Sequence, residues 1–171
     1  MKIGFIGTGY IAKSVITGIL GCKLKINKIF ISKRNKKISN FLSKKSRKIV
    51  IINNNQEIIN RSNWVFLSVT PKVGNNILKC LNFKSNQTIV SFISTIKMSQ
   101  LKKYIKVKAT IVRAIPLPPI SLRKGPVPIF PPNKKSKTFS INLVLPLKLE
   151  MKNFLKTFGL LQECMHLFTN C

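Results

Sequence analysis

The chain has 171 residues, room for one domain of ordinary size, and its hydrophobic fraction of 44% is sufficient for a buried core. It carries 31 Lys and Arg residues against 3 Asp and Glu residues, a formal net charge of +28. These counts exclude sites that need several carboxylates, such as paired-carboxylate glycosidase sites, Ser-His-Asp triads and carboxylate metal sites, and the 4 cysteines contain no CxxC pair that would indicate a zinc finger.

Short apolar runs alternate with helical patterns through residue 115, which predicts a parallel α/β sheet. Strands are expected at residues 2–6, 28–31, 49–52, 64–69, 88–93 and 110–115. Helices are expected at residues 11–19, 38–42, 57–59, 73–81 and 99–104, with Gly21 as the cap that ends the first one.

The composition and the hydrophobic pattern of the sequence change after residue 115. Residues 116–133 hold most of the prolines, so this segment is predicted to be a loop, a polyproline-like stretch or an edge strand. Residues 134–171 show no strand–helix alternation and are predicted to form an irregular tail. The expected organisation is therefore a nucleotide-binding domain at 1–115, a Pro-rich loop at 116–133 that completes the edge of the site, and the tail.

A glycine-rich motif lies between the first strand and the first helix. It has the pattern G-x-G-x-x-A and consists of Gly7, Thr8, Gly9, Tyr10, Ile11 and Ala12. The first glycine allows a tight turn, the second lets a pyrophosphate approach the backbone, and the alanine keeps the helix close to the sheet. In this strand–turn–helix context the motif predicts a Rossmann-type, doubly wound parallel sheet that binds a dinucleotide at the helix N-terminus.

The end of the second strand indicates which dinucleotide is bound. An NAD-binding domain places an acid there to hold the ribose 2′-hydroxyl, whereas this chain has Ser32, Lys33 and Arg34. Cations at this point would bind a 2′-phosphate, so the predicted cofactor is NADP(H). The alternative is that Lys33 and Arg34 belong to a generally basic surface.

Four segments resemble pyrroline-5-carboxylate reductases: residues 2–12, Asn55-Gln56-Glu57, residues 66–72 and residues 112–116. The resemblance implies reduction of the C=N bond of a small cyclic imine by NADPH, with proline as the product. It also implies that Ser32, Lys33 and Arg34 hold the 2′-phosphate and that Asn55 touches the adenosine ribose. The same resemblance assigns the lining of the cofactor and the border of the nicotinamide to Val69, Thr70, Pro71 and Pro116.

The sequence departs from the family at two places. Leu117 and Pro118 stand where the family has Asn and Thr, so the end of the nicotinamide pocket is expected to differ. Family members continue into a helical domain that dimerises and binds the substrate carboxylate, and this domain is expected to be missing here. The tail is compatible with a reading frame that slips from about residue 139. On this hypothesis the chain is truncated, binds NADP(H) with little or no turnover, and does not assemble like its homo-oligomeric relatives.

Two alternative functions stay open. One is another NADP-dependent reductase module, of the imine or F420-linked type. The other is a basic nucleic-acid-binding protein, but the densest basic run, residues 33–48, contains a single aromatic residue, Phe41, so no specific nucleic acid is expected. No apolar run is long enough for a membrane span, no signal peptide is apparent, and a cytoplasmic location is expected. No metal site and no confidently assigned catalytic residue are predicted.

Overall fold

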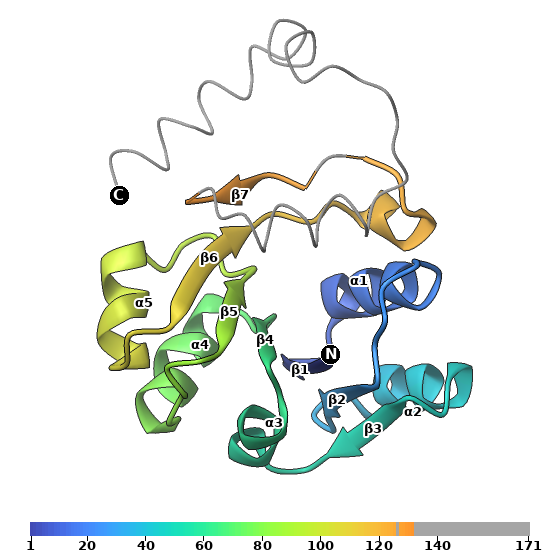
Figure 1. Ribbon diagram of the computed structural model, residues 1–171, viewed down its shortest axis with the longest axis horizontal. Coiled ribbons are helices and arrows are strands. Elements are labelled where there is room, and N and C mark those ends of the chain that lie inside the picture. Colours follow the sequence, from blue (N-terminus) through green and yellow to red (C-terminus); the bar gives the residue numbers. More distant parts are fainter. Residues whose placement is uncertain (126, 132–171) are drawn as a thin grey trace, which may run out of the picture.

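A seven-stranded sheet organises the computed structural model, which describes residues 1–125 and 127–131 (Figure 1). The strand order is β3-β2-β1-β4-β5-β6-β7, and all neighbours are parallel except β6 and β7. The expected α/β, doubly wound Rossmann-type fold is therefore confirmed. The strands are Lys2–Ile6 (β1), Lys28–Ser32 (β2), Ile49–Ile52 (β3), Trp64–Leu67 (β4), Thr88–Ser91 (β5), Thr110–Ala114 (β6) and Ile129–Phe130 (β7).

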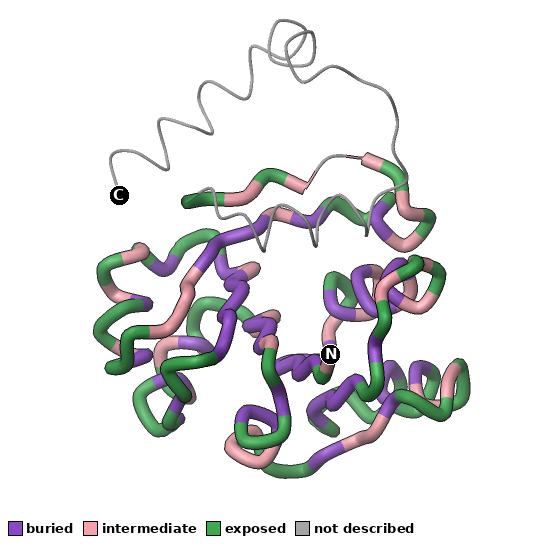
Figure 2. Tube along the Cα trace, viewed as in Figure 1, coloured by how far each residue is buried: buried purple, intermediate pink, exposed green. Residues whose placement is uncertain are grey.

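The helices cover the two faces of the sheet as separate layers (Figures 1 and 2). One core packs the first two helices and a 3₁₀ turn against one face, and a second core packs the remaining helical segments against the other. The first group is Tyr10–Leu20 (α1), Lys36–Lys45 (α2) and Pro118–Leu122 (η2). The second group is Asn55–Arg61 (α3), Pro71–Ile77 (α4), Leu78–Cys80 (η1) and Met98–Ile105 (α5).

Alternation along the strands sends side chains into both cores, as expected for a sheet that is covered on two sides. In β1, Ile3 and Phe5 belong to the core under α1, whereas Ile6 belongs to the core under α3. Gly4 lets α3 approach β1 closely, because a Cβ atom there would lie 2.4 Å from Ser62 Oγ. Because helices cover both faces, the accessible parts of the parallel sheet are the amino ends and the carboxyl ends of its strands. Below, these are called the amino edge and the carboxyl edge.

Two expectations about element boundaries are corrected by the structure. The fourth strand ends at Leu67 instead of residue 69, because the chain turns at Ser68, whose hydroxyl donates to the Gly7 carbonyl at 2.6 Å. The fifth strand likewise ends at Ser91 instead of residue 93. Pro71 follows as the first residue of α4, a position where its missing N–H costs nothing.

The Pro-rich segment contributes to the same sheet. β7 pairs with β6 in antiparallel register, Arg113 opposite Phe130 and Ala114 opposite Ile129. η2 packs against α1, and the Arg123 guanidinium donates to the Gly21 carbonyl at 2.8 Å. Residues 116–125 and 127–131 are thereby joined to the sheet. The tail predicted at 134–171, with its hypothetical frame shift near 139, lies outside the described residues.

None of the helices within residues 1–125 and 127–131 combines the length and the apolar character that a membrane span requires.

Candidate functional site

The residues predicted to bind a cofactor meet at one edge of the sheet, the edge formed by the carboxyl ends of the parallel strands. The glycine motif follows β1, and Ser32 ends β2 and is followed by Lys33 and Arg34. Asn55 follows β3, Val69 to Pro71 follow β4, and Pro116 follows β6. The strand order reverses between β1 and β4, so the sheet has its topological switch point there, next to the glycine motif. In open α/β sheets this is where ligands bind.

Gly7 makes the turn that leaves β1. Its φ is +95°, in the region that favours glycine, and a Cβ atom there would lie 2.6 Å from both the Ser68 carbonyl oxygen and Val69 Cγ1. The end of β4 therefore lies directly against the glycine turn. The predicted role of Gly7 as the residue that permits the tight turn is consistent with this geometry.

Ser32 locks the glycine turn to the end of β2. The Gly7 N–H donates to Ser32 Oγ at 3.1 Å, and the Thr8 hydroxyl donates to the Ser32 carbonyl oxygen at 2.7 Å. The two hydroxyl oxygens are 3.0 Å apart, so the Ser32 hydroxyl completes the network by donating to Thr8. Thr8 and Ser32 are both buried. The Ser32 hydrogen is thus used within the loop, which leaves Lys33 and Arg34 as the donors at this position.

Gly9 differs from Gly7 because the protein itself does not require a glycine there. Its backbone is extended, with φ of −91°, and a Cβ atom would meet no protein atom within 4 Å. Gly9 is the N-cap of α1 and provides no side-chain cap, so the first-turn N–H groups keep their donor capacity. The open space beside these N–H groups fits a phosphate group that must approach the backbone closely.

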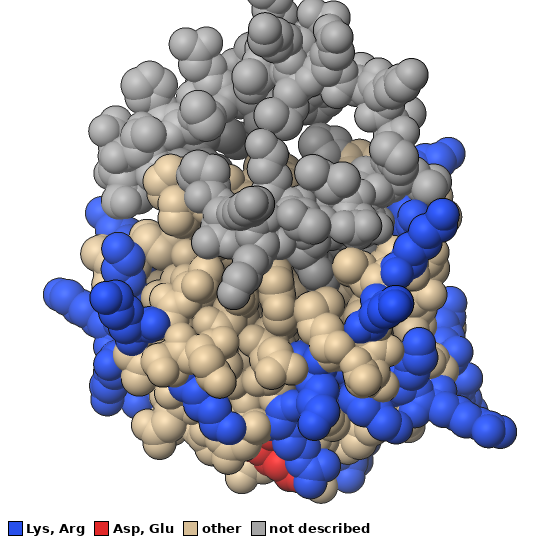
Figure 3. Space-filling view, in the orientation of Figure 1, with Lys and Arg blue, Asp and Glu red and all other residues tan. Residues whose placement is uncertain are grey.

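Lys33 and Arg34 lie in the short connection between β2 and α2. The Lys33 N–H donates to the Ile52 carbonyl oxygen at 3.2 Å, and Asn35 caps α2 by accepting from the Ile38 N–H at 3.1 Å. The backbone on both sides of the two cations is therefore fixed, while their side chains are exposed. In the face shown in Figure 3, Lys and Arg side chains lie around a central area of other residues, and acidic atoms occupy one small area.

The remaining predicted residues line the same edge with different exposure. Asn55 is the first residue of α3, and the adjacent Asn54 provides the cap of that helix. Val69 is half-buried, Thr70 and Pro71 are exposed, and Pro116 is buried.

Sequence reasoning missed two residues of this edge, Ser94 and Thr95. They are exposed in the connection that follows β5. The signal that could have found them is their position directly after a predicted strand.

Arg113 supports the loop that contains these two residues. Its side chain is buried, and its guanidinium donates to the carbonyl oxygen of Ile96. This contact joins the end of β6 to the segment between β5 and α5.

Three comparisons with known proteins bear on this geometry. The family model described as "NADP oxidoreductase coenzyme F420-dependent" matches residues 2–95. The chain is 28% identical to pyrroline-5-carboxylate reductase 3 of Danio rerio over 128 residues, which cover 73% of this chain and 44% of that relative. It thus spans less than half the length of the curated relative it matches.

Solved structures agree on the fold. The 1-pyrroline-5-carboxylate reductase of Streptococcus pyogenes has a TM-score of 0.70 at 21% identity, and the match covers 98% of this chain and 66% of that one. The pyrroline carboxylate reductase of Plasmodium falciparum, solved with NADP bound, has a TM-score of 0.68 at 18% identity, covering 84% and 53%. An imine reductase of Streptomyces aurantiacus has a TM-score of 0.63 at 11% identity, covering 85% and 53%.

These matches confirm the resemblance to pyrroline-5-carboxylate reductases that the motifs indicated, and the cofactor named for the matched family agrees with the NADP(H) prediction. Because the family model covers more than half of the sequence, the chain belongs to the family of NADP oxidoreductases described as coenzyme F420-dependent.

Proposed function

We propose that this chain binds NADP(H) at the carboxyl edge of its sheet and acts in the NADPH-dependent reduction of the C=N bond of a small imine, 1-pyrroline-5-carboxylate, to proline. The observation that carries the proposal is the open space at Gly9, at the N-terminus of α1 and beside the switch point of the sheet. Nothing in the fold requires a glycine at this position, whereas a bound pyrophosphate would.

Each group of residues has a distinct task in this proposal. The first-turn N–H groups of α1 bind the pyrophosphate, and Gly9 keeps their approach clear. Lys33 and Arg34 bind the 2′-phosphate by charge-assisted hydrogen bonds, and Asn55 contacts the adenosine ribose. Val69, Thr70, Pro71 and Pro116 position the nicotinamide end. The bound cofactor supplies a hydride for the imine carbon.

We also propose that residues 1–131 bind the cofactor with little turnover when they act alone. Hydride transfer requires the imine to be held over the nicotinamide with water excluded. At this edge Tyr10 is 78% exposed and Leu117, next to Pro116, is 46% exposed, so the described residues do not cover these two side chains. Groups that orient the imine carboxylate must therefore come from outside these residues.

Calorimetric titration of the full chain with NADPH, NADH and a single-stranded oligonucleotide at physiological salt tests the binding step. We expect NADPH to bind at least about tenfold more tightly than NADH, which corresponds to ~1.4 kcal/mol. Oligonucleotide binding that survives this salt while NADPH does not bind would favour the nucleic-acid alternative instead. Oxidation of NADPH in the presence of pyrroline-5-carboxylate then measures turnover.

A second candidate function is hydride transfer between NADP(H) and coenzyme F420, because the matched family is described by that coenzyme. Both candidates use the same cofactor edge and differ in the second reactant. Parallel assays with pyrroline-5-carboxylate and with F420 as hydride acceptors from NADPH separate them: oxidation by only one of the two assigns the reaction class.

A further inference from the structure

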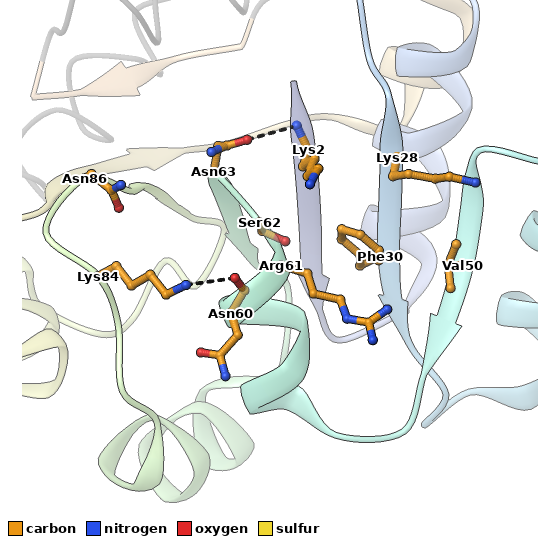
Figure 4. A pocket seen from close by; sticks show the side chains of 10 residues that line it. All are labelled: Lys2, Lys28, Phe30, Val50, Asn60, Arg61, Ser62, Asn63, Lys84 and Asn86. Carbon is orange, nitrogen blue, oxygen red and sulfur yellow. Dashed lines mark hydrogen bonds between the residues drawn. The ribbon is translucent and has the colours of Figure 1, made fainter.

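A cavity of about 680 Å³ lies at the opposite end of the strands from the glycine motif (Figure 4). Lys2 and Lys28 begin β1 and β2, Arg61 ends α3, Asn63 precedes β4, and Lys84 precedes β5. Parallel strands place their amino ends together, so these side chains meet although they are far apart in the sequence.

The lining is strongly cationic. It contains the side chains of Lys2, Lys28, Arg61 and Lys84, and it contains no Asp or Glu. The acid nearest in sequence, Glu57, is outside the lining and pairs with Arg61 at 2.7 Å. A guanidinium has five N–H donors, so this pair leaves Arg61 with further donors for an anion.

Hydrogen bonds fix part of this lining before any ligand arrives. The Lys84 ammonium donates to the Asn60 carbonyl oxygen at 2.9 Å, and Asn63 Oδ1 accepts from the Lys2 N–H at 3.3 Å, both drawn in Figure 4. The lysine keeps two donors and the Asn63 amide keeps its NH₂ group. The Lys28 ammonium is instead bound to a residue outside the lining, because it donates to the Arg47 carbonyl oxygen at 3.3 Å.

The floor of the cavity offers a flat surface. The Arg61 guanidinium lies 6.0 Å from the centroid of the Phe30 ring, an arrangement in which the cation covers an aromatic face. A guanidinium plane can stack a planar group on its other side. The volume falls within the range of sites for small organic ligands and exceeds what a single phosphate needs.

We propose that this cavity at the amino edge of the sheet, formed by Lys2, Arg61, Asn63 and Lys84, binds a phosphorylated small molecule of nucleotide size. The phosphates are held by Lys2 and Lys84, and the planar part stacks on Arg61 above Phe30. This site is separate from the proposed cofactor edge, because the two lie at opposite ends of the strands. It is therefore independent of the proposed function.

Calorimetry with ATP at physiological salt, without magnesium, tests the site in the full chain. The double variant Lys2→Gln/Lys84→Gln is expected to raise the Kd for ATP at least about tenfold. Lys44→Gln/Lys103→Gln removes two exposed lysines that do not line the cavity and is expected to change the Kd by less than about twofold. Equal weakening by both double variants would overturn the site, since diffuse attraction by the basic surface would then explain binding.

Two further variants show whether a loss of ATP binding comes from misfolding or from binding at the cofactor edge. Asn86→Asp places a carboxylate in the lining without removing a charge and is expected to weaken ATP binding; a wild-type Kd would contradict the proposal. Gly9→Ala is expected to bind ATP like the wild type, and loss of binding there would place ATP at the glycine motif instead. Absence of ATP binding to the wild type would also overturn the proposal. If inorganic pyrophosphate bound as tightly as ATP, the inference that the ligand has the size of a nucleotide would be wrong.

Discussion

Thr8 and Ser32 place their hydroxyl oxygens 3.0 Å apart and so join the turn after β1 to the end of β2. Because the Gly7 N–H also donates to Ser32 Oγ at 3.1 Å, one buried serine fixes the conformation of the glycine motif. The shape of the proposed pyrophosphate site thus depends on a side chain that stands 25 residues further along the chain.

Ser32→Ala is expected to destabilise the protein. The variant leaves the buried Gly7 N–H without its acceptor, which costs about 1–3 kcal/mol in the free energy of unfolding. Urea denaturation measures this difference, with Ser43→Ala as the control, because the Ser43 hydroxyl bonds only within α2 and its loss should cost less than about 0.5 kcal/mol. Equal free energies for the two variants would show that Ser32 does not hold the turn.

Alanine at the two motif glycines should affect different properties: the stability of the fold at Gly7 and the affinity for NADPH at Gly9. Gly7→Ala forces a side chain into a left-handed conformation, which alone costs about 1–2 kcal/mol, and brings Cβ to 2.6 Å from the Ser68 carbonyl oxygen. Gly9→Ala meets no atom, so the free energy of unfolding should change by less than about 0.5 kcal/mol while the affinity for NADPH falls at least about tenfold. Thermal unfolding and NADPH titration separate the two effects, and unchanged NADPH affinity in a folded Gly9→Ala protein would refute the assigned site.

Arg34→Ala is expected to weaken NADPH binding selectively. A charge-assisted hydrogen bond to the 2′-phosphate contributes about 1.5–3 kcal/mol, and NADH lacks that phosphate. The Kd for NADPH should therefore rise by at least about tenfold while the Kd for NADH stays within about twofold. Arg47→Ala, which removes an exposed arginine after α2, is the matched control. Similar losses for both cofactors would mean that Arg34 acts through general charge alone.

Local patterns in the sequence were sufficient to predict most of the strands and the glycine turn. Apolar runs predicted β1 to β6 because each buried strand needs a nearly continuous hydrophobic stretch. The position of Gly7 between strand and helix predicted the tight turn, in which the structure gives Gly7 a positive φ. An edge strand was one of the alternatives predicted for residues 116–133, and the two-residue strand β7 is such a strand; its position was not predicted, since it lies among prolines and is defined only by its pairing with β6.

Other features of the candidate site depend on which strands become neighbours. The Ser32 hydroxyl turns inward to Gly7 because β1 and β2 are adjacent, and the cationic cavity forms because β1, β2 and β4 begin at one edge. Neither relationship leaves a local signal in the sequence: a serine after a strand and lysines at strand starts are both ordinary.

A buried glutamine shows how far such long-range contacts determine stability. Gln87 is 2% exposed, its amide N–H groups donate to the Ile59 and Ser62 carbonyl oxygens at 2.7 and 2.8 Å, and its Oε1 accepts from the Lys84 N–H at 2.9 Å. Gln87→Leu removes the partner of the Lys84 N–H and the donors to the Ile59 and Ser62 carbonyl oxygens, of which Ile59 keeps the Ser62 N–H at 3.1 Å. The free energy of unfolding should fall by at least about 2 kcal/mol, as measured by urea denaturation. In the control Gln100→Leu, the lost bond to the partly buried Tyr104 hydroxyl should cost about 1 kcal/mol or less. An equally small loss for Gln87→Leu would show that the three hydrogen bonds of Gln87 do not stabilise the connection into β4.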